Sequence, residues 1–171
     1  MTLGLALLAA LAANATAAPV VSYDATTDFS PYRNYSFVFT HPPGHLDPNL
    51  YRQVRVAIDH SLGAHGFGHS SPGDFAVAFT VGPRAKVHAT DYGHYAFYYS
   101  PEEAALHRAW VNRELADRSD RDDTLSIDIY DTYTKRSIWH GIAPAPIGPH
   151  MRQALVEHEV NEVLRLFPPK K

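Results

Sequence analysis

The sequence predicts an α+β fold in which a single antiparallel or mixed β-sheet carries two or three helices, packed mainly on one face as a two-layer sandwich. Three observations support this class. Apolar and polar residues alternate along several short segments, as in half-buried strands. Other segments repeat apolar residues with the spacing of an amphipathic helix. No repeat or linker divides the 171 residues, a length that suits one domain.

Composition narrows the kinds of partner and chemistry that we expect. A formal charge of −3 and a pI near 6.4 give no basic surface for nucleic acid, so no nucleic-acid partner is expected. The absence of cysteine excludes a disulfide framework, a thiolate metal site and a cysteine nucleophile. Histidine is the abundant reactive residue, with 11 copies.

The N-terminus predicts export. Residues 3–13 are continuously apolar, yet they are too few to span a bilayer. Small residues follow, and Ala15 and Ala17 occupy the −3 and −1 positions of a signal-peptidase site. We therefore expect a cleaved signal peptide over residues 1–17, a single mature domain over residues 18–171 and no transmembrane segment. No Lys or Arg precedes the apolar run, which leaves open whether Met1 is the true start.

The predicted sheet is organised around the stretch from Asp122 to Ala145. This stretch alternates apolar and polar residues, passes through a polar loop and alternates again, which predicts two antiparallel strands at the centre of the sheet. Further strands are predicted over 74–81 and over 33–40, where one face carries Tyr35, Phe37 and Phe39. Gly82 and Pro83 are predicted to interrupt the 74–81 strand with a bulge or bend.

Capping residues mark the first predicted helix. Asp47 can cap free amides, Pro48 suits the first helical position, and Gly66 suits a left-handed residue after the end. Phe67 is then expected to pack on Leu62. Two more helices are predicted, over 101–116 and over about 150–167.

The best metal candidate is the group His88, Asp91 and His94. Two imidazoles and a carboxylate within seven residues at a strand end could bind one ion such as Zn²⁺. The alternative is that these are solvated loop residues, because their spacing matches no known metal signature. His60, His65 and His69 do not all share one helical face, so no metal site is expected there.

The aromatic tract over 91–99 is a candidate surface for a ligand or partner. Its rings could stack on sugars or on a peptide, or they could cover the sheet as an irregular strand or lid. The candidate contact residues are Tyr92, Tyr95, Phe97 and Tyr99, together with His140 on the central hairpin.

The central strands also carry Asp128, Asp131 and His140, which could form an acid/base group if the strand pairing brings them together. Otherwise Asp128 lies on a polar face and Asp131 opens the turn. No serine elbow or phosphate-binding glycine loop accompanies them, so no catalytic residue is assigned. Whether Trp139 faces the same side as Ile127 depends on a one-residue choice of register.

Several short motifs follow one another along the chain in a characteristic order. They are Tyr23-Asp24, Asp28 to Tyr32, His65-Gly66-Phe67, Gly73-Asp74-Phe75, Thr124 to Asp131, Ile138 to Gly141 and Phe167-Pro168-Pro169. Together they resemble the bacterial envelope family called domain of unknown function 4136, over the whole mature chain. The resemblance implies an exported protein, often a lipoprotein, with no established activity.

The chain departs from the family pattern at three points. It lacks the lipid-accepting cysteine, so we expect a periplasmic or secreted protein without a lipid anchor. Asp123 stands where the family usually has Gly, and His140 stands where it usually has Arg. If that Arg has a charge-dependent role, His140 would supply it only when protonated.

These observations predict an exported bacterial envelope protein with a non-enzymatic binding or envelope-maintenance role. Its expected partner is an envelope protein or a small ligand, and no cofactor is expected. The alternative is a histidine-dependent metal-binding protein or a small metal-dependent hydrolase, with Zn²⁺ as the cofactor.

Overall fold

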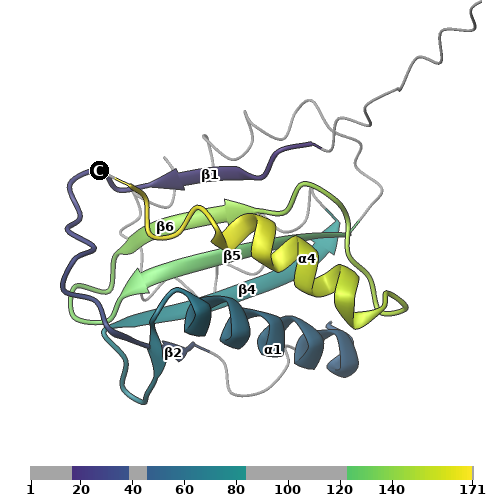
Figure 1. Cartoon of the computed structure of the whole chain (residues 1–171), viewed down its shortest axis with the longest axis horizontal. Coiled ribbons are helices and arrows are strands. Elements are labelled where there is room, and N and C mark those ends of the chain that lie inside the picture. The colour runs from purple at the N-terminus through teal and green to yellow at the C-terminus, as the bar shows by residue number, and fades with distance from the viewer. Residues whose placement is uncertain (1–16, 39–45, 84–122, 171) are drawn as a thin grey trace, which may run out of the picture.

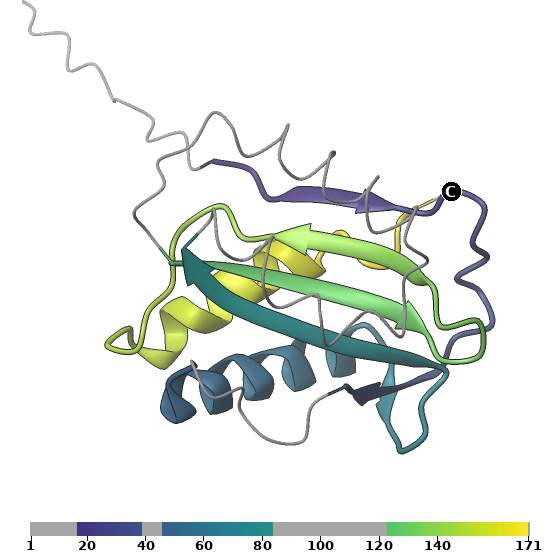
Figure 2. The same ribbon diagram turned by 180° about the vertical axis from the view of Figure 1, so that it is seen from behind.

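The computed structural model describes residues 17–38, 46–83 and 123–170. Within these residues one six-stranded mixed sheet carries two helices, and both helices lie on the same side of it (Figure 1), as the view from behind also shows (Figure 2). The predicted α+β class is confirmed. The elements are β1 (Val20–Tyr23), β2 (Asn34–Phe37), α1 (Pro48–Ala64), β3 (Gly68–His69), β4 (Phe75–Pro83), β5 (Asp123–Asp131), β6 (Ser137–Ile142) and α4 (Gln153–Leu164).

The strand order in the sheet is β1-β6-β5-β4-β2-β3. Strand β6 pairs antiparallel with both β1 and β5, and β5 pairs antiparallel with β4. Strand β2 is parallel to both β4 and β3. Helix α1 follows β2 in the chain and precedes β4, so it makes the crossover that two parallel neighbours require. The strands β5 and β6 form the predicted hairpin and occupy inner positions of the sheet.

The pairing of β5 with β6 settles the orientation of Trp139. Trp139 lies opposite Ile129, and Gly141 lies opposite Ile127, so Trp139 and Ile127 share the face that the helices cover. A register shift next to Tyr130 inserts one extra residue into β6 before this pairing. A Cβ on Gly141 would collide with the Trp139 ring and with α4, so only glycine fits beneath the indole.

Helix α1 begins and ends as its capping residues predict. The Asp47 carboxylate accepts hydrogen bonds from the N–H groups of Asn49 and Leu50, both at 2.9 Å. At the other end, the N–H of Phe67 donates to the carbonyl of Leu62 at 3.0 Å. The residue between, Gly66, has a φ of +87°, the left-handed conformation that glycine adopts without strain.

Helix α4 is shorter than the predicted 150–167. It begins after Arg152, whose extended backbone (φ −68°, ψ 143°) cannot belong to the helix. The α-helical hydrogen bonding does not continue to Phe167. The N–H of Phe167 donates to the carbonyl of Leu164, three residues back, instead of to a carbonyl four residues back. The buried apolar residues of the helix are Val156, Val160, Val163 and Leu164.

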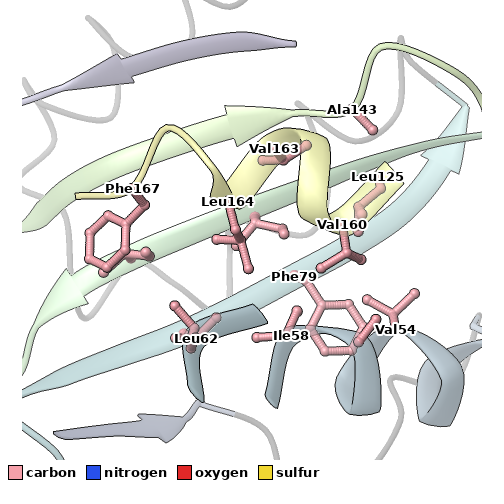
Figure 3. Close-up of a cluster of buried hydrophobic side chains, with 14 of the residues drawn as sticks. Val54, Ile58, Leu62, Phe79, Leu125, Ala143, Val160, Val163, Leu164 and Phe167 are labelled. Atoms are coloured by element: carbon pink, nitrogen blue, oxygen red, sulfur yellow. The ribbon is translucent and has the colours of Figure 1, made fainter. Parts of the chain in front are cut away.

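The main core lies between the two helices and the sheet. In Figure 3, side chains of α1 and α4 point toward one another and toward Phe79 of β4 and Leu125 of β5. An aromatic group continues the core beyond the end of α4, with Phe167 in edge or tilted contact with rings from four segments. These rings are Phe29, Phe67, Phe75 and Trp139.

The predicted interruption at Gly82 and Pro83 is wrong. Strand β4 pairs with β5 without a register shift from Phe75 to Pro83, which lies opposite Asp123. Pro83 is the last described residue of β4, and among the described strands it pairs only with β5, because β2 lies alongside β4 only as far as Val77. The helix predicted over 101–116 lies outside the described residues, as does Phe39 of the 33–40 segment.

Candidate functional site

The sheet face opposite the helices is polar at its centre, and it is buried as well. Along β4 this face presents Ala76, Ala78 and Thr80, so its side chains are small, as the sequence indicates. Neighbouring β5 presents polar side chains at alternate positions, and these are no more than 5% exposed. They are Thr124, Ser126, Asp128 and Tyr130.

Asp128 and His140 form a buried pair at the middle of this face. They are cross-strand neighbours on β5 and β6, and the Nδ1 atom of His140 lies 2.6 Å from Oδ1 of Asp128. Each residue is only 1% exposed. Beside them, the hydroxyls of Thr80 and Ser126 are 2.9 Å apart and hydrogen-bonded across β4 and β5. Four polar side chains therefore meet on three adjacent strands.

A carboxylate held against one imidazole nitrogen fixes the orientation of the ring, as it does in many acid/base sites. General acid/base catalysis also requires a substrate within hydrogen-bond distance. With both residues 1% exposed, the pair meets protein rather than solvent in this structure. What the arrangement does directly is satisfy two polar groups that would be costly to bury alone.

Asp131 does not join this pair, and it organises the β5–β6 turn as predicted. Its carboxylate accepts hydrogen bonds from the Tyr32 hydroxyl at 2.8 Å and from the Thr134 hydroxyl at 2.8 Å. Burial tends to raise the pKa of Asp131, but the hydrogen bonds from Thr134 and Tyr32 outweigh burial and lower it. Burial and the same contact with Asp131 raise the pKa of Tyr32.

The other predicted site residues lie outside the described residues. These include the metal candidates His88, Asp91 and His94, so a Zn²⁺ site there stays a prediction. The same holds for the aromatic candidates: a binding surface there stays a prediction, because Tyr92, Tyr95, Phe97 and Tyr99 are not described. Within residues 17–38, 46–83 and 123–170, no group of three or more His, Cys, Asp or Glu side chains could hold a metal ion.

Sequence reasoning did not single out Glu159. Its side chain is buried, with 7% exposure, and its Oε2 atom accepts a hydrogen bond from the N–H of Ala145 at 3.1 Å. Burial raises the pKa of this carboxyl group. Helical periodicity could have predicted its burial. Glu159 is next to Val160 and three positions after Val156, so it falls on the buried side of α4.

The mixed sheet, the helices on one of its faces and the buried polar centre of the other define a small α+β two-layer sandwich domain. In the described part of the chain, none of the helices has the length and apolar character needed to cross a membrane. The chain belongs to the family described as domain of unknown function (DUF4136), whose model matches residues 19–169. No curated protein matches the chain.

Two crystal structures have a similar fold. A PDZ domain protein from Parabacteroides distasonis ATCC 8503 is 14% identical with a TM-score of 0.54; the match covers 91% of this chain and 36% of that protein. A DUF4136 family protein from Bacteroides thetaiotaomicron VPI-5482 is 12% identical with a TM-score of 0.52, and the match covers 90% of this chain and 96% of that one. At these identities the likeness establishes the fold alone. This chain spans about a third of the first protein and nearly all of the second.

Proposed function

We propose that this protein is an exported bacterial envelope protein that acts by binding rather than by catalysis, in the periplasm or outside the cell. Its partner is an envelope protein or a small ligand. Two features support the proposal: the predicted cleavage site precedes every described element, and the polar groups best suited to chemistry are buried.

The predicted cleavage site lies just before the first described strand and the start of the family match, and this observation supports the proposal most directly. The sequence predicts cleavage between Ala17 and Ala18. The first described strand begins at Val20, and the family match begins at residue 19. Removal of residues 1–17 would therefore leave every described strand and helix intact, as export with signal cleavage requires.

Burial of the central polar pair supports binding over catalysis. Asp128 and His140 are the described residues whose arrangement comes closest to an acid/base pair, and both are 1% exposed. A substrate could not approach either group within hydrogen-bond distance without displacing the protein around it. Binding would instead use other side chains, and the sequence offers the aromatic tract over 91–99 as the candidate.

Export is tested by expressing the full chain in a Gram-negative host and determining the N-terminus and mass of the periplasmic product. We expect a protein that begins at Ala18. Ala17→Leu places a bulky side chain at the −1 position and should leave the precursor uncleaved. Ala18→Leu, one position later, is the matched control and should be processed normally. Recovery of uncleaved wild-type protein in the cytoplasmic fraction would contradict export.

Binding is tested separately by placing a photo-crosslinking amino acid at Tyr95 in the exported protein. We expect a discrete adduct in intact cells. The same amino acid at Tyr133, which is 93% exposed on the β5–β6 turn, serves as the control for chance encounters. Equal labelling from both positions, or none from Tyr95, would count against a binding surface on the aromatic tract.

A further inference from the structure

The loop between β6 and α4 has few hydrogen-bond donors, and the structure uses all of them. Three of the residues over 144–149 are prolines, which have no N–H, so the backbone donors are those of Ala145, Ile147 and Gly148. The N–H of Ala145 donates to the Glu159 carboxylate at 3.1 Å, and that of Ile147 donates to the carbonyl of Asp123 at 2.9 Å. The third donor bonds a sulfur atom.

That sulfur belongs to Met151. The N–H of Gly148 lies 3.2 Å from the Sδ atom of Met151, and the N–H of Met151 donates to the carbonyl of Gly148 at 3.1 Å. These two contacts close the turn that leads into α4. The N-cap residue of the helix, Arg152, makes no side-chain capping bond. The thioether therefore helps to hold both the loop and the first turn of α4.

Met151 is also chemically distinctive in this chain. The sequence contains no cysteine and two methionines, of which the other is Met1. The Met151 side chain is half-buried and packs against the edge of the hydrophobic core. A thioether in this position combines an apolar contact, a hydrogen bond and partial access to solvent.

We infer that Met151 is a redox-sensitive anchor for the β6–α4 loop. Hydrogen peroxide converts its thioether to a sulfoxide. A sulfur lone pair attacks one peroxide oxygen, and the S–O bond forms as the O–O bond breaks. The departing oxygen takes the proton from the transferred oxygen and leaves as water. Sulfur is oxidised by two electrons and the peroxide is reduced by two, so no further reactant is needed.

The sulfoxide does not fit the geometry that the thioether satisfies. Oxidation consumes one sulfur lone pair and leaves the sulfur partially positive, so the sulfur no longer accepts the Gly148 N–H as it does in the 3.2 Å contact. A polar, chiral group also replaces an apolar one at the edge of the core. The loop consequently loses one of its three backbone anchors, and the start of α4 loosens with it.

The test compares the purified protein before and after hydrogen peroxide treatment. We expect the mass to rise by one oxygen atom at Met151 and the melting temperature to fall by about 2–4 °C. Hydrogen exchange at the Gly148 amide should become at least about fivefold faster, while exchange in the β4–β5 ladder stays unchanged. Treatment with methionine sulfoxide reductase should reverse all three changes.

Met151→Leu is the matched variant, because leucine keeps the volume and apolar character but cannot be oxidised. Its melting temperature should not respond to peroxide. If peroxide leaves Met151 unmodified, or if the sulfoxide form keeps the original melting temperature and Gly148 exchange, the inference is overturned. An equal fall in the melting temperature of Met151→Leu on peroxide treatment would also overturn it. Should that variant fail to fold, reversal by the reductase still decides the question for the wild-type chain.

Discussion

The Asp128–His140 pair shows how a single cross-strand position determines the character of a sheet face. The two residues are cross-strand neighbours, each 1% exposed, and Nδ1 of His140 lies 2.6 Å from Oδ1 of Asp128. Burying a carboxylate without a partner costs several kcal/mol, whereas a well-placed pair offsets most of that cost. Loss of one member therefore costs far more than the pair itself contributes.

Asp128→Ala should lower the free energy of unfolding by about 3–5 kcal/mol, because it leaves the His140 ring buried without its carboxylate. The measurement is urea unfolding followed by circular dichroism. Asp123→Ala, at the exposed end of the same strand, is the control and should change stability by less than about 0.5 kcal/mol. Similar effects from the two variants would show that burial of the pair is not what matters.

The loop between β6 and α4 depends on a side chain of the helix that follows it. Glu159 is held beneath this loop by the Ala145 N–H. Its burial raises its pKa, and the Ala145 hydrogen bond offsets this only in part. A carboxyl group whose folded pKa exceeds its unfolded value favours the folded state most below the unfolded pKa. That stability is lost as the pH rises through the folded pKa.

Glu159→Gln removes this loss, because the amide cannot ionise but can still accept the hydrogen bond from Ala145. The stability of the variant relative to wild type should therefore increase as the pH is raised from about 4 to about 7. Urea unfolding at several pH values provides the measurement. Glu159→Ala removes the acceptor and should be less stable than Glu159→Gln throughout. A constant difference between Glu159→Gln and wild type across this range would show that the burial of the charge is not costly.

The elements themselves were largely predictable, because the signals that define them are local. Asp47, Pro48 and Gly66 mark both ends of α1, and apolar alternation marks β5 and β6. The predicted break at Gly82 and Pro83 of β4 is wrong, because glycine and proline are only local signals for a break. The structure instead continues the ladder through them as long as β5 lies alongside. Pairing with the neighbouring strand β5, which the local sequence does not reveal, keeps Gly82 and Pro83 in the ladder.

For the whole molecule, Phe167 connects segments that are far apart in the sequence. It is buried against rings from Phe29, Phe75 and Trp139, so it joins the N-terminal region, the sheet and the end of the chain. Phe167→Ala should lower the free energy of unfolding by about 3–5 kcal/mol, as expected for a large core truncation. Leu166→Ala, at the half-buried neighbouring position, should lower it by on the order of 1 kcal/mol. Thermal and urea unfolding would each measure the difference.

The candidate site was predictable only in part, and the missing information was global. The residue types on the central strands identified Asp128 and His140, but their contact depends on strand register and on an irregularity beside Tyr130. The contacts that link Gly148 to Met151 and Ala145 to Glu159 depend on how α4 docks beneath the loop. Periodicity predicts which side of a helix is buried, and it does not reveal which backbone group lies opposite.

The position of β1 has a consequence for the order in which the protein can fold. In the described sheet, β1 pairs with β6, and Tyr23 lies opposite Trp139. A ribosome releases the first strand early and its partner only after most of the chain has been made. During that interval the nascent chain cannot complete its sheet, and the closing contact spans more than a hundred residues. Contacts of such high sequence separation are slow to form, so we expect β1 to join the sheet late in folding.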